Sequence, residues 1–124
     1  NEEKRKHNIE VNTRIILKII DELRKDKIEY VFLIFDPRET ALGNDWRDTF
    51  LEKLLVDNGA PLLLTKEMIK KDAVRKHIDV KVVKDYYLPS PDNHPNAYQN
   101  GIIAGQIKQF IMEHDKVSRS RSKS

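Results

Sequence analysis

The sequence contains no cysteine. Disulfide bonds, thiolate nucleophiles and cysteine-based zinc or iron–sulfur sites are therefore excluded. Glycine and proline are scarce, with 4 and 5 residues in 124, which argues against collagen-like and low-complexity chains. No apolar run approaches the roughly 20 residues that a helix needs to cross a bilayer. The 39% hydrophobic and 35% charged residues are typical of a globular chain that forms one domain or part of one.

The net charge of +3 comes from the C-terminal end of the chain. Residues 116–124 carry four cations and no acid, whereas the other 115 residues hold 19 basic and 20 acidic side chains. Four cations give at most weak, sequence-independent binding to phosphate groups. We therefore do not expect a nucleic acid as the partner. The Ser/Arg/Lys composition of residues 115–124 predicts a disordered basic tail.

Apolar spacing predicts helices and strands in alternation. Residues 1–8 are a charged lead-in, which is either the frayed start of a helix or a surface segment. Five aliphatic residues at helical spacing then predict a helix over about 10–26 with one shared apolar face: Ile15, Ile16, Ile19, Ile20 and Leu23. The continuous apolar runs at 30–35 and 61–65 predict short strands buried on both faces, as in a parallel sheet. Further helices are expected from Trp46 to a cap at Asn58–Gly59, over 67–76 and over about 97–114. Alternation at 78–82 allows an edge strand or an extended segment.

This order of elements predicts an α/β fold. Two clear strands are few for a complete parallel sheet, which needs several strands and cover on both faces. We therefore expect part of the sheet to lie outside this chain.

The candidate site lies in the loop at residues 86–96, which holds three of the five prolines. Asp92 and His94 are two residues apart, directly before the last predicted helix. A carboxylate beside a histidine holds the ring in one tautomer and leaves its other nitrogen available as a general base. Prolines stiffen the loop, which lowers the entropy cost of ordering the histidine. A turn or helix-capping role for Asp92 remains an alternative.

The segment at 92–107, DNHPNAYQNGIIAGQI, resembles the last conserved block of the SGNH (GDSL-type) hydrolases. The order of elements over residues 9–112 is similar to the second half of that fold. The resemblance implies a three-layer α/β/α sandwich with a mostly parallel sheet, only the C-terminal part of which is present. It also implies ester hydrolysis or acyl transfer with His94 as general base and Asp92 as its carboxylate, without a metal or organic cofactor. Since many members work outside the cytoplasm, it favours an extracytoplasmic location.

The sequence departs from the family pattern in three places. Many members have their aspartate three residues before the histidine, where this chain has Pro91, and a common glycine is replaced by Gln99. The Gly-Asp-Ser nucleophile block is absent, and Asn44 lies in the wrong context for an oxyanion role. Ser90 is the one serine before the tail, and it shares the stiff loop with His94, where it cannot easily attack a carbonyl that His94 serves.

Two interpretations stay open. The chain is the C-terminal part of an esterase or acyltransferase whose serine lies in the N-terminal part of the domain or in a second chain, with an ester or acylated carbohydrate as substrate. Alternatively, it is a degenerate relative that docks a carbohydrate or a protein partner without catalysis.

Several other polar residues receive simpler interpretations. His7, His77 and His114 have no metal-ligand spacing and are expected on the surface. Four acids near the loop after residue 35 are expected to be solvated or to stabilise a helix N-terminus: Asp36, Glu39, Asp45 and Asp48. Arg38 follows a strand end, where α/β folds bind ligands, and is a candidate contact for an anionic substrate group. We expect Tyr86 and Tyr87 to pack beside the site, and Tyr98 to line its mouth.

Overall fold

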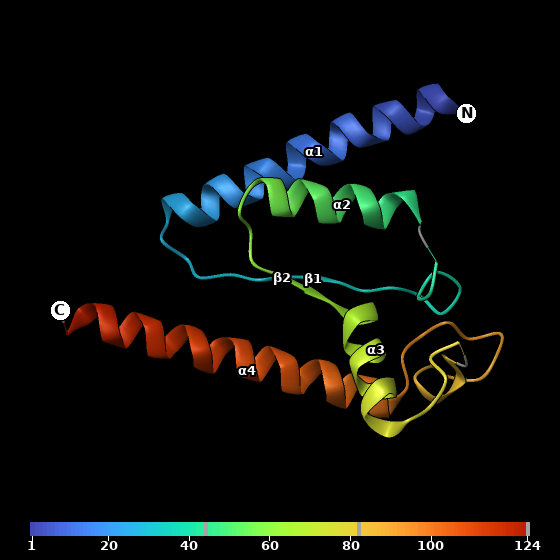
Figure 1. Ribbon diagram of the computed structural model, residues 1–124. Coiled ribbons are helices and arrows are strands. Elements are labelled where there is room, and N and C mark those ends of the chain that lie inside the picture. The colour runs from blue at the N-terminus through green and yellow to red at the C-terminus, as the bar shows by residue number, and fades with distance from the viewer. Residues whose placement is uncertain (44, 82, 124) are drawn as a thin grey trace. The chain divides into compact units, whose positions relative to one another are not determined.

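The computed structural model describes residues 1–43, 45–81 and 83–123, with the backbone alone at residue 118 (Figure 1). It is a mixed helix-and-strand structure with a small two-stranded parallel sheet. The chain divides into two compact units. Unit 1 comprises Asn1–Phe35 and Asn44–Leu64, and unit 2 comprises Asp36–Gly43 and Thr65–Ser124.

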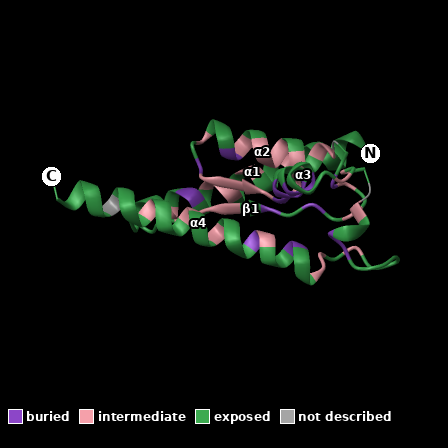
Figure 2. Ribbon diagram, turned by 60° about the horizontal axis from the view of Figure 1, so that its bottom comes forward, coloured by how far each residue is buried: buried purple, intermediate pink, exposed green. Residues whose placement is uncertain are grey.

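Unit 1 is a βαβ arrangement preceded by a long helix. Its elements are α1 (Glu2–Lys25), β1 (Phe32–Ile34), α2 (Trp46–Asp57) and β2 (Leu62–Leu64). The strands pair in parallel, with Phe32 opposite Leu62 and Ile34 opposite Leu64. Both helices lie on the same side of the strands in the two views (Figures 1 and 2). The helix predicted from Trp46 to the Asn58–Gly59 cap is confirmed.

The core of unit 1 is aliphatic. Its buried residues come from each element or the loop beside it: Ile20, Ile34, Leu55 and Ala60. The predicted apolar face of the first helix was too wide, because Ile15 and Ile19 are 52% and 44% exposed. Adjacent residues on a helix lie about 100° apart, so a helix that packs on one layer buries Ile16 and Ile20 but turns Ile15 and Ile19 away.

The helices of unit 2 are α3 (Thr65–Lys76) and α4 (Ala97–Ser122), with a 3₁₀ turn at Val83–Asp85. The two α-helices pack against each other. The core cluster of this unit combines two aliphatic residues, Ala41 and Ile69, with two aromatic ones, Tyr86 and Tyr87. The loop at 86–96 leads directly into α4, so the candidate site belongs to unit 2.

The first three helices end in the same way. Just beyond each helix, one residue donates its backbone N–H to the carbonyl of the residue five positions earlier. These bonds run from Ile28 to Leu23, from Ala60 to Leu55 and from Ile78 to Ala73. This 6→1 hydrogen bond requires a left-handed residue just before the donor, here Lys27, Gly59 and His77 with φ of 54°, 63° and 58°. The sequence predicts this kind of helix end only at Gly59, because lysine and histidine are unusual at positive φ.

The structure differs from the sequence-based predictions at both ends of the chain. The charged lead-in is helical, since Asn1 caps α1 through a 3.0 Å bond from the Glu3 N–H to its side-chain oxygen. The basic tail, expected to be disordered, continues α4 to Ser122. Once a helix is nucleated, each added residue gains a hydrogen bond at little cost, and cations near a helix C-terminus are favourable.

The predicted sheet is present only in part. Leu33 and Phe35 are 39% and 37% exposed, so the apolar run around β1 is not buried on both faces as predicted. The described residues hold two strands, and the three-layer sandwich is not confirmed. Residues 78–81 form no strand, and Val82 lies outside the described residues. Of the helices described, none is both long enough and apolar enough to span a membrane.

Candidate active site

Two backbone hydrogen bonds close the loop that carries His94. The Leu88 N–H donates to the His94 carbonyl at 3.0 Å, and the Asn96 N–H donates to the Tyr86 carbonyl at 3.0 Å. These bonds form one antiparallel bridge across the base of the loop. The conformation of residues 89–93 is therefore constrained at both ends.

Asn96 joins the loop to α4. Its side-chain oxygen accepts the Gln99 N–H at 2.9 Å, which caps the helix N-terminus. Its side-chain nitrogen donates to the Asp85 carbonyl at 2.7 Å. The asparagine of the His-Pro-Asn segment thus has a structural role that fixes where the loop ends.

Asp92 and His94 form a hydrogen-bonded pair. One carboxylate oxygen, Asp92 Oδ1, lies 2.6 Å from His94 Nδ1 and also accepts the His94 backbone N–H at 2.9 Å. The backbone bond first, and then the bond to the ring, hold the pKa of Asp92 below its ordinary value. Asp92 therefore stays ionised at neutral pH and favours the His94 tautomer that carries its proton on Nδ1.

The rest of the His94 ring is accessible. Its side chain is 81% exposed, and the residues that the structure describes give Nε2 no hydrogen-bond partner. In the Nδ1–H tautomer, Nε2 carries a lone pair and can accept a proton. The pair can thus act as a general base toward a group that approaches from outside the loop.

The loop after β1 supports the His94 loop by hydrogen bonds. Asn93 donates through its side-chain amide to Glu39 Oε1 at 2.8 Å. The Tyr87 hydroxyl donates to the Asp36 carbonyl at 2.7 Å. These two contacts connect positions more than 50 residues apart in the sequence. No local sequence pattern predicts them.

Asp36 is fully buried and not solvated, and it fits the alternative expectation of an acid at a helix N-terminus. Its Oδ2 accepts the Thr65 hydroxyl at 3.2 Å and the Lys66 N–H at 3.3 Å. Asp36 therefore stabilises the N-terminus of α3 from a different part of the chain. Asp45 does the same locally for α2, since its side chain accepts the Arg47 N–H at 2.8 Å.

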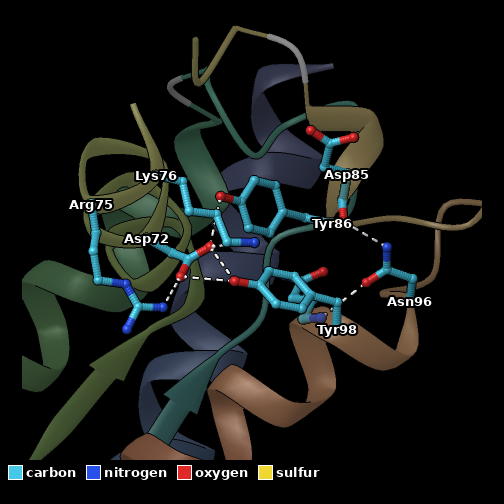
Figure 3. A network of polar contacts seen from close by, with 8 residues as sticks. Asp72, Arg75, Lys76, Asp85, Tyr86, Asn96 and Tyr98 are labelled. Carbon is cyan, nitrogen blue, oxygen red and sulfur yellow. Dashed lines mark hydrogen bonds and ion pairs between the residues drawn. The ribbon is translucent and has the colours of Figure 1, made fainter. Parts of the chain in front are cut away.

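A second polar cluster, centred on Asp72, joins α3 to Tyr86 and Tyr98 (Figure 3) and has no counterpart among the predictions from sequence. Buried Asp72 on α3 accepts the Tyr86 hydroxyl at 2.9 Å and the Tyr98 hydroxyl at 2.8 Å. Arg75 and Lys76 add ion pairs at 2.5 and 3.6 Å. Asp72 therefore holds Tyr86, the residue whose carbonyl closes the His94 loop.

The sequence carries one signal for this cluster. Asp72 lies four residues after Met68 on the buried side of α3, and a charge on an apolar helix face needs a partner. Burial alone would raise the pKa of Asp72, but hydrogen bonds from Tyr98, Tyr86 and Arg75 outweigh burial and lower it. Burial, and then the bond to Asp72, raise the pKa of Tyr86 far above its ordinary value.

Two further residues of the site differ from expectation. Tyr98 is bonded to Asp72, with Lys76 Nζ 3.5 Å from the centre of its ring, so it supports the helix pair rather than lining a mouth. Gln99 is 1% exposed inside unit 2, and neither polar atom of its side-chain amide has a hydrogen-bond partner of ordinary geometry.

The remaining candidates are not brought to the site. Ser90 is exposed on the loop, and its hydroxyl makes no hydrogen bond to His94 in the described structure. His7 and His77 are exposed, whereas His114 is half-buried and stacks on Phe110 with ring centres 5.4 Å apart. The described residues contain no group of three or more potential metal ligands. Asn44 lies outside the described residues.

No protein-family model, curated protein or solved structure matches the chain.

Proposed function

We propose that the chain is the C-terminal part of a serine ester hydrolase or acyltransferase of the SGNH type. The observation that carries this proposal is the 2.6 Å contact between Asp92 Oδ1 and His94 Nδ1 on an otherwise accessible ring. A serine outside this chain attacks the ester carbonyl, and Nε2 of His94 takes the proton of the serine hydroxyl. His94 then returns that proton to the leaving alcohol, while Asp92 stabilises the imidazolium form.

The incomplete sheet supports a separate source for the serine. The apolar run around β1 keeps two partly exposed side chains, Leu33 in the strand and Phe35 directly after it. A parallel sheet normally has both faces covered and several strands. A further segment that completes the three-layer sandwich would cover these side chains and bring the nucleophile, as the family resemblance implies.

The test is to express the chain together with the upstream part of its gene and to assay short-chain p-nitrophenyl esters. Replacement His94→Ala is expected to lower kcat by at least about a hundredfold, since general-base catalysis contributes roughly 10²–10⁴. His7→Ala, a change of an exposed histidine on α1, is the control and should leave kcat unchanged. Near-normal activity of His94→Ala would refute the proposal.

A non-catalytic binding module is the second candidate. Unit 1 has a hollow of about 310 Å³ between α1 and α2, lined by Trp46, Phe50 and Asn12 among others. An aromatic ring beside amide groups suits a carbohydrate, and this hollow needs no nucleophile. A fluorophosphonate probe separates the two candidates, because it labels an activated serine in the first and nothing in the second.

A further inference from the structure

Arg38 occupies the loop after β1 with most of its hydrogen-bonding capacity unused. Its side chain is half-buried, and its one hydrogen bond in the described structure is a long one of 3.4 Å from Nη1 to the Leu88 carbonyl. A guanidinium has five N–H donors in a planar fork. The neighbouring Glu39 accepts a hydrogen bond from Asn93 instead.

A short hydrogen-bonded path links this guanidinium to the backbone of the candidate base. Leu88, whose carbonyl accepts the bond from Arg38, donates its own N–H to the His94 carbonyl at 3.0 Å. Arg38 is therefore connected to the His94 backbone through two hydrogen bonds that meet at Leu88. Both residues belong to unit 2, and the loop that carries His94 is closed at its base, so this neighbourhood is fixed within the unit.

We propose that Arg38 binds an anionic group, a carboxylate or a phosphate, on the ester that His94 acts on. This inference rests on the proposed function and specifies its substrate class. A planar guanidinium matches a carboxylate or phosphate with two parallel hydrogen bonds, which a lysine cannot do.

The charges of the two loops favour an anion at Arg38 alone. Asp92 and Glu39 carry carboxylates on the same pair of loops and repel an anion, whereas the guanidinium of Arg38 attracts it. An anionic ester is therefore accepted only when its charged end reaches Arg38. A neutral ester gains nothing from Arg38.

The test follows binding rather than turnover, on the full 124-residue chain. Monomethyl succinate, an ester with a free carboxylate, is titrated at constant ionic strength while NMR records the Arg38 Nε–H and Leu88 amide signals. Both signals should shift to saturation, with a midpoint about tenfold lower than that of the exposed Arg14 on α1, as one charge-assisted pair provides. Dimethyl succinate, the neutral diester, should leave the Arg38 signal in place.

The variants decide the assignment. Arg38→Gln should abolish the saturable shift at Leu88, and Arg38→Lys should weaken it. If Arg38 responds like Arg14, or if Leu88 still shifts in Arg38→Gln, the anion site is overturned. Saturable binding at Arg38 combined with full esterase activity of His94→Ala would instead overturn the ester chemistry and leave the anion site standing.

Discussion

The two units of this chain bury different kinds of side chains. The core of unit 1 is aliphatic, with Ile20, Ile34 and Leu55 at its centre. All of the buried polar residues in the described structure belong to unit 2: Asp36, Thr65, Asp72 and Gln99. Two fully or nearly fully buried tyrosines complete that unit.

Apolar burial in unit 1 mainly stabilises the fold, whereas hydrogen bonds in unit 2 mainly fix the position of a loop. Apolar burial is non-directional and tolerates any shape that fills the space. Hydrogen bonds require given distances and angles, so a network of them fixes where a loop lies. The unit that carries His94 is the one that uses such a network, from Asp72 through Tyr86 to the base of the loop.

The largest effect is expected in unit 1. Leu55 is 2% exposed in the aliphatic core, so Leu55→Ala should cost about 3 kcal/mol of unfolding free energy through lost transfer energy and a cavity. Leu55→Met conserves volume and should cost less than about 1.5 kcal/mol. Urea unfolding measures both variants. If Leu55→Met lost as much unfolding free energy as Leu55→Ala, the core of unit 1 would depend on exact side-chain shape and not only on filled volume.

In unit 2, a change without loss of volume should also be costly. Tyr86→Phe removes one hydroxyl from Asp72 and should cost about 1.5 kcal/mol, the usual value for a hydrogen bond to a charged group. Tyr98→Phe loses a similar bond from a ring that is 39% exposed, and it should cost less. Amide hydrogen exchange in residues 86–96 is the second readout, and an unchanged rate in Tyr86→Phe would disconnect the network from the loop.

The acid limb of the stability curve should reflect Asp72. Its pKa in the folded chain is lowered, so its contribution is fully present above its unfolded pKa of about 3.9 and is lost as pH falls through the folded value. Asp72→Asn should therefore be less stable than the parent at pH 6 and should lose less stability between pH 5 and 2. Asp45→Asn is the comparison in unit 1. The hydrogen bond from Arg47 lowers the pKa of Asp45 to about 2, but solvent screens this pair because the Arg47 side chain is 67% exposed.

The smallest effect on stability is expected at the candidate site. The Asp92–His94 pair is exposed and screened by solvent, so Asp92→Ala should leave the unfolding free energy nearly unchanged. The same change should redistribute the His94 ring proton from Nδ1 toward Nε2, which ¹⁵N shifts of the ring report. Asp79→Ala is the matched control, because Asp79 also accepts a backbone N–H two residues on but has no histidine there. An unaltered tautomer in Asp92→Ala would remove Asp92 from the mechanism.

Much of the fold could be predicted because its elements are locally encoded. The Asn58–Gly59 cap and the apolar runs around β1 and β2 locate three elements within a few residues. Helix lengths at the chain ends were underestimated, since charged segments lack an apolar stripe yet extend an existing helix at little cost. The burial of Ile15 and Ile19 was overestimated, because periodicity shows that a face exists and not how much of it a partner covers.

For the site, the sequence established the Asp92–His94 pair as a hypothesis, because residues two positions apart in a turn are held together by local geometry. It did not predict that Asp36 would be buried, nor that Asp72 would hold two tyrosines. Those contacts join residues 14 to 51 positions apart, and only packing brings them within hydrogen-bond distance. Local chemistry thus determined which side chain is the candidate base, because Asp92 and His94 are close in the sequence, and the tertiary structure decided which buried hydrogen bonds hold its loop in position.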